Sequence, residues 1–194
     1  MGSRCFIGVV KNREWKVAKY CNFFYNDPFD EGFEIVEILK TSVDELRKGV
    51  DNCYFVDENC ISEEEKEDNF YLQSYAGADI LNGIIDSNNK IPLIDDSDFF
   101  TNYFECMISY IINLDMNRLL VYLDGNLNFV GEYNIYKLPF WEKIRADIDN
   151  CRNSEDYISP LMKGPYSFEG FKKHDEIIKK TVAKLQKERG YYFP

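Results

Sequence analysis

The chain has 194 residues, of which 45% are hydrophobic, and this is enough for one domain with a well-formed core. Its formal net charge of −11 argues against a nucleic-acid backbone or an anionic membrane as the default partner, because both are bound by clustered Lys and Arg. The charge leaves open a basic protein partner, or mimicry of nucleic acid by an acidic face.

Residues 5–22 predict a β-hairpin with its turn at 11–14. The first strand is apolar and β-branched, and the second alternates between two faces. This alternation places Trp15 on the same face as Val17. Gly8, in the middle of the first strand, indicates a bulge or the close approach of another group.

Helical patterns fill the stretch that follows. Residues 32–40 carry an apolar stripe, and Ser-Val-Asp-Glu at 42–45 predicts the start of a second helix that ends near position 49. The same capping pattern at 62–65 predicts an acidic, exposed helix. Residues 76–85 predict a further helix, and 98–105 a short one.

The strongest β signal lies in the second half of the chain. Three strands are expected, at 107–114, 119–123 and 129–138, joined by tight turns. A proline ends the third strand. The three strands therefore predict an antiparallel meander.

These elements predict an α+β protein. Its antiparallel sheet of about five strands combines the N-terminal hairpin with the late three-strand meander and is covered by helices on one face. After a helix at 141–151, a long C-terminal amphipathic helix is expected at 167–189. Residues 1–194 are interpreted as one domain, with 150–194 as an alternative C-terminal helical extension.

Cysteine and histidine usage gives no metal signal. The six Cys form no Cys-x-x-Cys pair, and His174 is the single His, so the short ligand spacings of a zinc site are missing. No cofactor is expected. The sequence begins without an apolar leader and has no apolar run of membrane-spanning length. We therefore expect reduced cysteines, a cytoplasmic location and no membrane partner.

One carboxylate cluster, Asp27, Asp30 and Glu31, lies in an aromatic-rich loop between a predicted strand and a predicted helix. Such a cluster can bind a divalent metal or supply an acid and a base. The simpler interpretation is that Asp27 or Asp30 caps the helix that begins near Gly32 and that the negative charges favour its N-terminus.

Three stretches, taken in order, carry a family resemblance: "RCFIGVV" followed by "KVAKYCNFF…DPFDEGFEIVEIL", then "YAGADIL", then "ECMISYIINLDMNRLLVYL". Together they resemble a family of small proteins common in phages, prophages and gut Firmicutes, for which no activity is established. The resemblance covers about residues 4–124. Family members usually have Trp-Asp-Gly-Tyr-Pro in the loop, whereas this chain has Phe-Tyr-Asn-Asp-Pro at 24–28. A ligand shared by the family would therefore be bound differently here, or be replaced by another.

The resemblance implies a recognition site in the loop at 20–32, where the family concentrates polar and aromatic side chains. Tyr and Phe rings can stack on a base, and helix N–H groups can bind an anionic group. The candidate ligand-binding residues are Arg4, Tyr20, Asn22, Phe24, Tyr25, Asp27 and Asp30.

Three functions follow as hypotheses. The first is a non-catalytic binding protein, encoded by a phage or prophage and acting in counter-defence in the host cytoplasm. It would sequester a signalling nucleotide, with Arg4 and Lys19 as the local basic residues, or block a host defence protein through the acidic stretch 58–68. The second is a metal-dependent hydrolase that uses the carboxylate cluster. The third is a structural or regulatory phage module, for which a stable homo-oligomer is expected.

Overall fold

The computed structural model describes residues 3–23, 29–74, 76–102 and 105–157, together with the separate positions 180, 183, 184 and 187. The strands of this part of the chain are β1 (Ser3–Lys11), β2 (Glu14–Phe23), β3 (Cys53–Val56), β4 (Ile91–Ile94), β5 (Ile108–Asn113), β6 (Arg118–Leu123) and β7 (Asn128–Asn134). The α-helices are α1 (Asp30–Gly49), α2 (Glu63–Asp68), α3 (Asp79–Asp86), α4 (Ser97–Phe100) and α5 (Trp141–Arg152).

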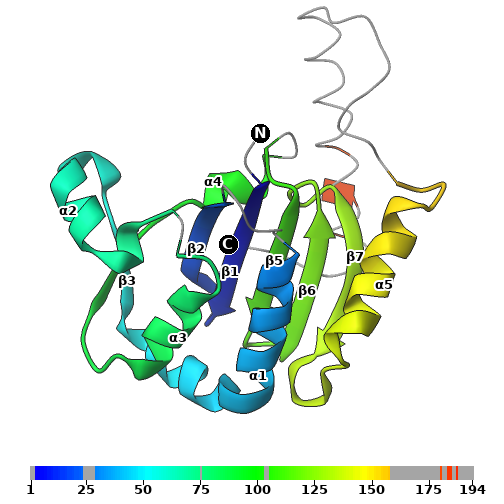
Figure 1. The fold of residues 1–194 in the computed structure, drawn as a ribbon, viewed down its shortest axis with the longest axis horizontal. Helices are drawn as coiled ribbons and strands as arrows, with labels where there is room; N and C mark the ends of the chain where they lie inside the picture. The colour runs from blue at the N-terminus through cyan, green and yellow to red at the C-terminus, as the bar shows by residue number, and fades with distance from the viewer. Residues whose placement is uncertain are drawn as a thin grey trace, which may run out of the picture.

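The main sheet joins the N-terminal hairpin to the meander in the order β2-β1-β5-β6-β7. β1 pairs antiparallel with β2, and β6 pairs antiparallel with both β5 and β7. The two halves meet where β1 runs parallel to β5, with Cys5 opposite Ile108. The chain reaches β5 from β2, and the connection between these two strands contains α1, β3, α2, α3, β4 and α4 (Figure 1). The predicted α+β class with a five-strand, mostly antiparallel sheet is confirmed, and the central parallel pairing is the difference.

Helices α1, α3 and α5 lie on one face of the sheet (Figure 1). One apolar cluster includes Ile7 of β1, Tyr110 of β5, Ile35 of α1, Ile80 of α3 and Ile148 of α5, all fully buried. Burying a large apolar side chain contributes roughly 1.5–3 kcal/mol. This cluster is therefore the main source of stability for the sheet and for the position of α1.

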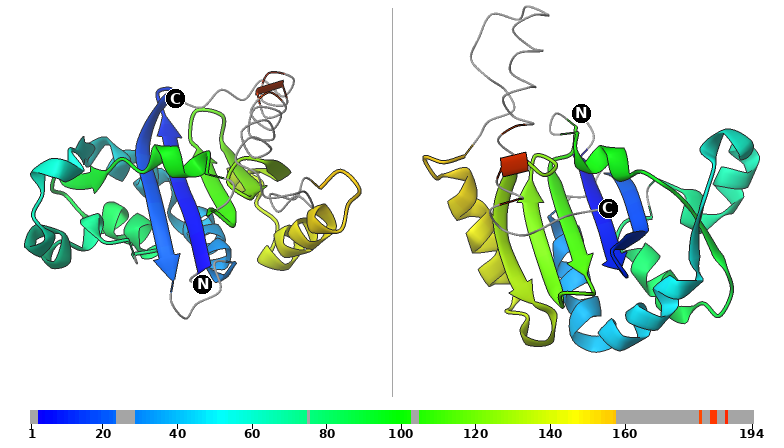
Figure 2. Two further views of the ribbon diagram at one scale, coloured as in Figure 1. Left: turned by 90° about the horizontal axis from the view of Figure 1, so that it is seen from above. Right: turned by 180° about the vertical axis from the view of Figure 1, so that it is seen from behind.

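The opposite face of the sheet carries a second, aromatic cluster. Phe6 stacks on Phe100 of α4 with the ring centroids 5.5 Å apart, and Tyr122 meets Phe100 edge-on at 5.6 Å. Figure 2 shows α4 at one end of this face, away from α1, α3 and α5. The abundance of aromatic residues therefore reflects, at least here, packing on a sheet with two buried faces.

A β-bulge in β2 changes the face on which Trp15 lies. The register of the β1–β2 pair shifts by one residue, which leaves Lys16 as the extra residue of β2. The predicted placement of Trp15 beside Val17 is therefore wrong, and Trp15 packs edge-on against Phe6 instead. Its indole lies against Gly8, where an added Cβ would be 2.5 Å from a ring carbon. Close approach, not a bulge at its own position, explains this glycine.

A two-stranded parallel sheet, β3 with β4, has no counterpart in the predicted elements. Its strand β4 contains a proline, Pro92, which lies opposite Tyr54. Just beyond β4, the Asp96 N–H donates a hydrogen bond to the Ala18 carbonyl oxygen of β2 at 3.0 Å. This contact partly covers the open edge of β2, as sheet edges commonly require.

The two predicted capping patterns coincide with a kink in α1 and with the start of α2. α1 continues across the predicted gap between two helices but kinks at Ser42, whose φ of −140° and ψ of 26° are not helical. At α2, Ser62 and Glu65 form the capping box: the Ser62 hydroxyl accepts the Glu65 N–H at 3.2 Å, and Glu65 Oε2 accepts the Ser62 N–H at 2.8 Å.

The end of the chain agrees with expectation in part. The predicted strand at 129–138 is shorter, because Asn134 accepts the Tyr136 N–H and starts a 3₁₀ turn, Ile135–Lys137. Helix α5 matches the predicted helix at 141–151. The predicted long helix at 167–189 lies outside the described residues, apart from positions 180, 183, 184 and 187. In the described part of the chain, no helix has the length and apolar character to cross a membrane.

Gly32 is a point of close contact between α1, α5 and the sheet. A Cβ at Gly32 would lie 2.2 Å from a ring carbon of Trp141 and 2.6 Å from the Tyr110 hydroxyl oxygen. We predict that Gly32→Ala lowers the free energy of unfolding by about 1–3 kcal/mol, although alanine favours a helix by about 1 kcal/mol. Urea unfolding measures the change, with Glu37→Ala on the exposed side of α1 as control. A Gly32→Ala variant as stable as wild type would contradict the close packing.

Candidate functional site

Three of the predicted ligand-binding residues lie together on one face of the β1–β2 hairpin. Arg4 is directly opposite Asn22, and Tyr20 shares a face with Asn22 because it is two residues away in the same strand. The Arg4 guanidinium pairs with Glu105 at 3.1 Å, and the Tyr20 ring packs on Phe99 with centroids 4.4 Å apart. The side chains of these three predicted residues therefore form one local group.

Two buried polar atoms of this group lack a hydrogen-bond partner. Among the described residues, Arg4 Nε and Asn22 Oδ1 are buried and unpaired. The first is a donor and the second an acceptor, and they belong to neighbouring strands. An unmet buried polar group costs about 1–3 kcal/mol. A water molecule, or a ligand that offers an acceptor beside a donor, would satisfy both atoms.

The other predicted residues are not all placed. Phe24, Tyr25 and Asp27 lie outside the described residues. Asp30 is exposed and is the first residue of α1, whose N-cap, Phe29, makes no side-chain capping bond. Asp30 therefore does not cap the helix, but its charge in the first turn favours the helix dipole.

Glu31 links two helices from a buried position. Its Oε2 accepts the Ala78 N–H, at 2.6 Å, at the start of α3. Gly77, with φ of +56°, leaves room for the carboxylate, since a Cβ there would lie 2.5 Å from Oε2. Burial raises the pKa of Glu31 to about 7, and the nearby carboxylates of Glu34 and Asp79 add to the shift. Within the described part of the chain, no group of three or more His, Cys, Asp and Glu residues is arranged to hold a metal ion.

The Glu31 shift predicts a pH dependence of stability. The folded-state pKa of about 7 lies above the ordinary 4.5, so the stability contributed by protonated Glu31 is present below the ordinary value and is lost as the pH rises through 7. We predict that Glu31→Gln, which keeps an acceptor for Ala78, matches wild type in acid and exceeds it by about 1–2 kcal/mol at mildly alkaline pH. Urea unfolding across this pH range measures the difference, with Glu45→Gln, at an exposed position of the same helix, as control. Parallel curves for wild type and Glu31→Gln would contradict the assignment.

A second region of interest is the segment 57–72, which we name the acidic lobe. It contains the 3₁₀ turn Glu58–Cys60 (η2), helix α2 and the 3₁₀ turn Phe70–Leu72 (η3), and it projects at the end of the molecule farthest from α5 (Figure 1). Lys66 is its single basic residue. Its exposed carboxylates are Asp57, Glu58, Glu63, Glu64, Glu65, Glu67 and Asp68.

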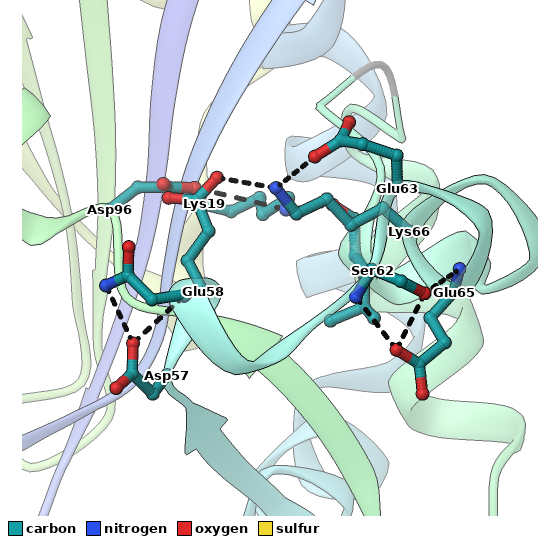
Figure 3. A network of polar contacts seen from close by, with 10 residues as sticks. Lys19, Asp57, Glu58, Ser62, Glu63, Glu65, Lys66 and Asp96 are labelled. Carbon is teal, nitrogen blue, oxygen red and sulfur yellow. Dashed lines mark hydrogen bonds and ion pairs between the residues drawn. The ribbon is translucent and has the colours of Figure 1, made fainter.

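Charged side chains line the junction between the acidic lobe and the sheet (Figure 3). Lys66 Nζ lies 3.0 Å from Glu58 Oε1 and 3.0 Å from Glu63 Oε1. From β2, the Lys19 ammonium donates a hydrogen bond to the Leu72 carbonyl oxygen at 3.3 Å. These contacts hold α2 to η2 and fix η3 beside β2.

Lys19 is buried and engaged with Asp96. Its Nζ lies 3.9 Å from Asp96 Oδ2, and its side chain is only 2% exposed. Burial lowers the pKa of Lys19, an effect that the Asp96 carboxylate opposes, and burial also raises the pKa of Asp96. Asp96 Oδ2 also accepts the Tyr20 N–H at 3.0 Å. Lys19 is therefore a structural cation and not an open phosphate contact.

A cavity of about 370 Å³ lies between the acidic lobe and β2. Its charged lining consists of two lysines and four carboxylates, Lys19, Lys66, Glu58, Glu63, Glu67 and Asp96. The surplus of carboxylates opposes binding of a phosphate group. Arg4 and Lys19, the basic residues expected to hold a nucleotide, are each already beside a carboxylate, Glu105 and Asp96.

The charge network at the junction was not predicted, although one signal was available. Strict alternation along β2 puts Lys19 on the core-facing side with Val17 and Cys21. A lysine in such a register requires a buried partner. The partner, Asp96, is far along the chain and could not be identified from local pattern.

The network predicts strong coupling between Lys19 and Asp96. Asp96→Ala removes both the acceptor of the Tyr20 N–H and the carboxylate that lies 3.9 Å from the Lys19 ammonium, so we expect a loss of about 2–4 kcal/mol of unfolding free energy. Lys19→Met in the same chain should recover about half of that loss, since methionine fills similar space without charge. A double-mutant cycle by urea unfolding measures the coupling. Purely additive effects would show that the two residues do not interact.

In comparisons with protein-family models, curated proteins and solved structures, no match to this chain was found. The resemblance of residues 4–124 to the phage-associated family thus stays a prediction from motifs.

Proposed function

We propose that this chain is a non-catalytic binding protein that uses its acidic lobe to block a basic surface of another protein. The supporting observation is the concentration of seven exposed carboxylates against one lysine in residues 57–72, at a projecting end of the fold. A surface of one sign attracts a partner of the opposite sign and repels nucleic acid and anionic membrane. The charge of the lobe therefore favours a basic protein as partner and disfavours nucleic acid and anionic membrane.

The junction with the sheet makes this surface suitable for binding. The capping box between Ser62 and Glu65 stabilises the start of α2 through contacts within the helix itself. Lys66 links α2 to η2 through Glu58. A pre-ordered surface loses less conformational entropy on binding than a disordered acidic segment does. The lobe is thus better suited to protein recognition than a solvated run of charge alone.

The setting in which this activity would matter comes from the resemblance to phage and prophage proteins. In that setting the partner is a host defence protein in the host cytoplasm, and the activity is counter-defence by inhibition. A basic groove that normally receives nucleic acid or a nucleotide would be the natural target of an acidic lobe.

A second candidate function has one observation in its favour. The unpaired Arg4 donor and Asn22 acceptor present the pattern that a carboxamide or the edge of a nucleobase could satisfy, and Tyr20 lies on the same face. This supports binding of a small nucleotide-like ligand at the end of the β1–β2 hairpin. The Arg4–Glu105 ion pair at 3.1 Å leaves less positive charge for a phosphate, so this candidate ranks second.

Charge reversal of the acidic lobe tests the main proposal. We predict that Glu63→Lys/Glu64→Lys/Glu67→Lys abolishes capture of the partner from host lysate by tagged protein, as measured by quantitative mass spectrometry. The capture by wild type should fall steeply as the ionic strength rises. Glu132→Lys/Glu142→Lys, which reverses exposed carboxylates outside the lobe, is the control and should capture as wild type does. Equal capture by the lobe variant and the control would contradict the proposal.

A thermal-shift screen tests the second candidate. We expect a nucleotide-like ligand, taken from cyclic oligonucleotides, NAD and ADP-ribose, to raise the melting temperature of wild type and not of Arg4→Met/Asn22→Leu. That variant removes the unpaired donor and acceptor together and should fold as well as wild type. If no compound stabilises wild type, the second candidate falls and the main proposal is unaffected.

A further inference from the structure

A hollow of about 680 Å³ opens beside α2, on a different side of the lobe from the Lys19 cavity. Its volume falls in the range of about 300–1,000 Å³ in which proteins bind small ligands or a few side chains. Its apolar lining, which we name the apolar wall, consists of Val56, Ile61, Phe70, Tyr71, Leu72 and Pro92.

The apolar wall is partly exposed and partly fixed. The Tyr71 hydroxyl donates a hydrogen bond to the Gly83 carbonyl oxygen at 3.0 Å, which anchors this ring to α3. Phe70 packs edge-on against Tyr71 and is 39% exposed. An exposed aromatic side chain beside an open hollow is a common anchor point for a partner protein.

The other lining residues of the hollow, which we name the acidic rim, are acidic or polar. The acidic rim is formed by Glu64, Glu65 and Asp68, with Ser62 and Asn69 beside them. Glu65 is occupied by the capping box, whereas Glu64 and Asp68 make no ion pair or side-chain hydrogen bond with any described residue. Two carboxylates are therefore available to a cation that approaches the hollow.

We propose that the hollow is the docking site for a basic amphipathic helix of the partner protein. An apolar side chain of that helix enters the hollow against Phe70, and Lys or Arg side chains on its flanks meet Glu64 and Asp68. This inference rests on the proposed function and specifies the partner's chemistry. The hollow is complementary to such a helix, because it combines an apolar wall with two carboxylates, Glu64 and Asp68, that pair with no other described residue.

A helix fits this site better than an added strand. A helix presents apolar and basic side chains on adjacent stripes at spacings of three and four residues, which matches an apolar wall beside an acidic rim. Strand addition requires a row of backbone donors and acceptors at a sheet edge. Pro92, which β4 contributes to the hollow, has no N–H to offer.

The test uses the full chain and defined probes. The probe is a fluorescent peptide of about 18 residues with Leu at helical spacing and Lys elsewhere. One control peptide has every Leu replaced by Ser, and a second has every Lys replaced by Glu. Anisotropy titration should show saturable binding of the Leu/Lys peptide, about tenfold or more tighter than that of either control.

Matched variants localise the binding. Phe70→Ser and Glu64→Lys/Asp68→Lys should each weaken binding of the Leu/Lys peptide about tenfold. Phe140→Ser, which removes a more exposed aromatic side chain at the start of α5, and Glu132→Lys/Glu142→Lys should leave it unchanged within about twofold. Thermal melts confirm that each variant is folded.

The outcomes separate this inference from the proposed function. If lobe reversal abolishes partner capture but Phe70→Ser leaves peptide affinity intact, the acidic lobe binds by charge alone and the docking site is overturned. Equal binding of the Leu/Lys and Ser/Lys peptides overturns it as well. If the chain self-associates in sedimentation runs and Glu64→Lys/Asp68→Lys prevents this, the occupant is a second copy and the proposed partner helix is overturned.

Discussion

The parallel pairing of β1 with β5 is the constraint on which the rest of the structure depends. It places an N-terminal hairpin beside a meander that begins about a hundred residues later, with Cys5 opposite Ile108. β2 ends at the end of the sheet where β5 begins, and β1 lies between these two strands, so the chain that joins them leaves the sheet and returns on the other side of β1. This connection contains α1 and α3, which cover one face, and α4, which contributes Phe100 to the other. It also contains the acidic lobe.

Local signals in the sequence were sufficient for the elements but not for their long-range partners. The hairpin and the meander join strands that follow each other in the chain, and the α2 cap joins Ser62 to Glu65, three residues later, so local sequence was enough to predict them. The parallel contact and the β3–β4 pair depend on residues far apart in sequence, and β4 contains a proline that argues locally against a strand. Trp15 was misplaced because one bulge residue, Lys16, reverses the alternation that the prediction assumed.

The candidate sites show the same division. Alternation along β2 correctly puts Tyr20 and Asn22 on one face, and pairing with β1 adds Arg4. The run of carboxylates in the acidic lobe was visible as composition. Composition did not predict the apolar wall of the hollow, to which β3, β4 and η3 all contribute. It also did not predict that Lys19 is buried against Asp96. Both depend on tertiary contacts, so a local pattern could not specify them.

The acidic lobe leaves and rejoins the fold at neighbouring places. β3 ends at Val56, which pairs with Ile94 of β4, and η3 at the other end of the lobe also packs against β4. The lobe contributes no strand to the main sheet, so the pairing of that sheet does not include residues 57–72. A graft of another segment at residues 57–72 would therefore exchange the proposed binding surface without changing the strand pairs of the main sheet, and a new specificity could arise there by local change.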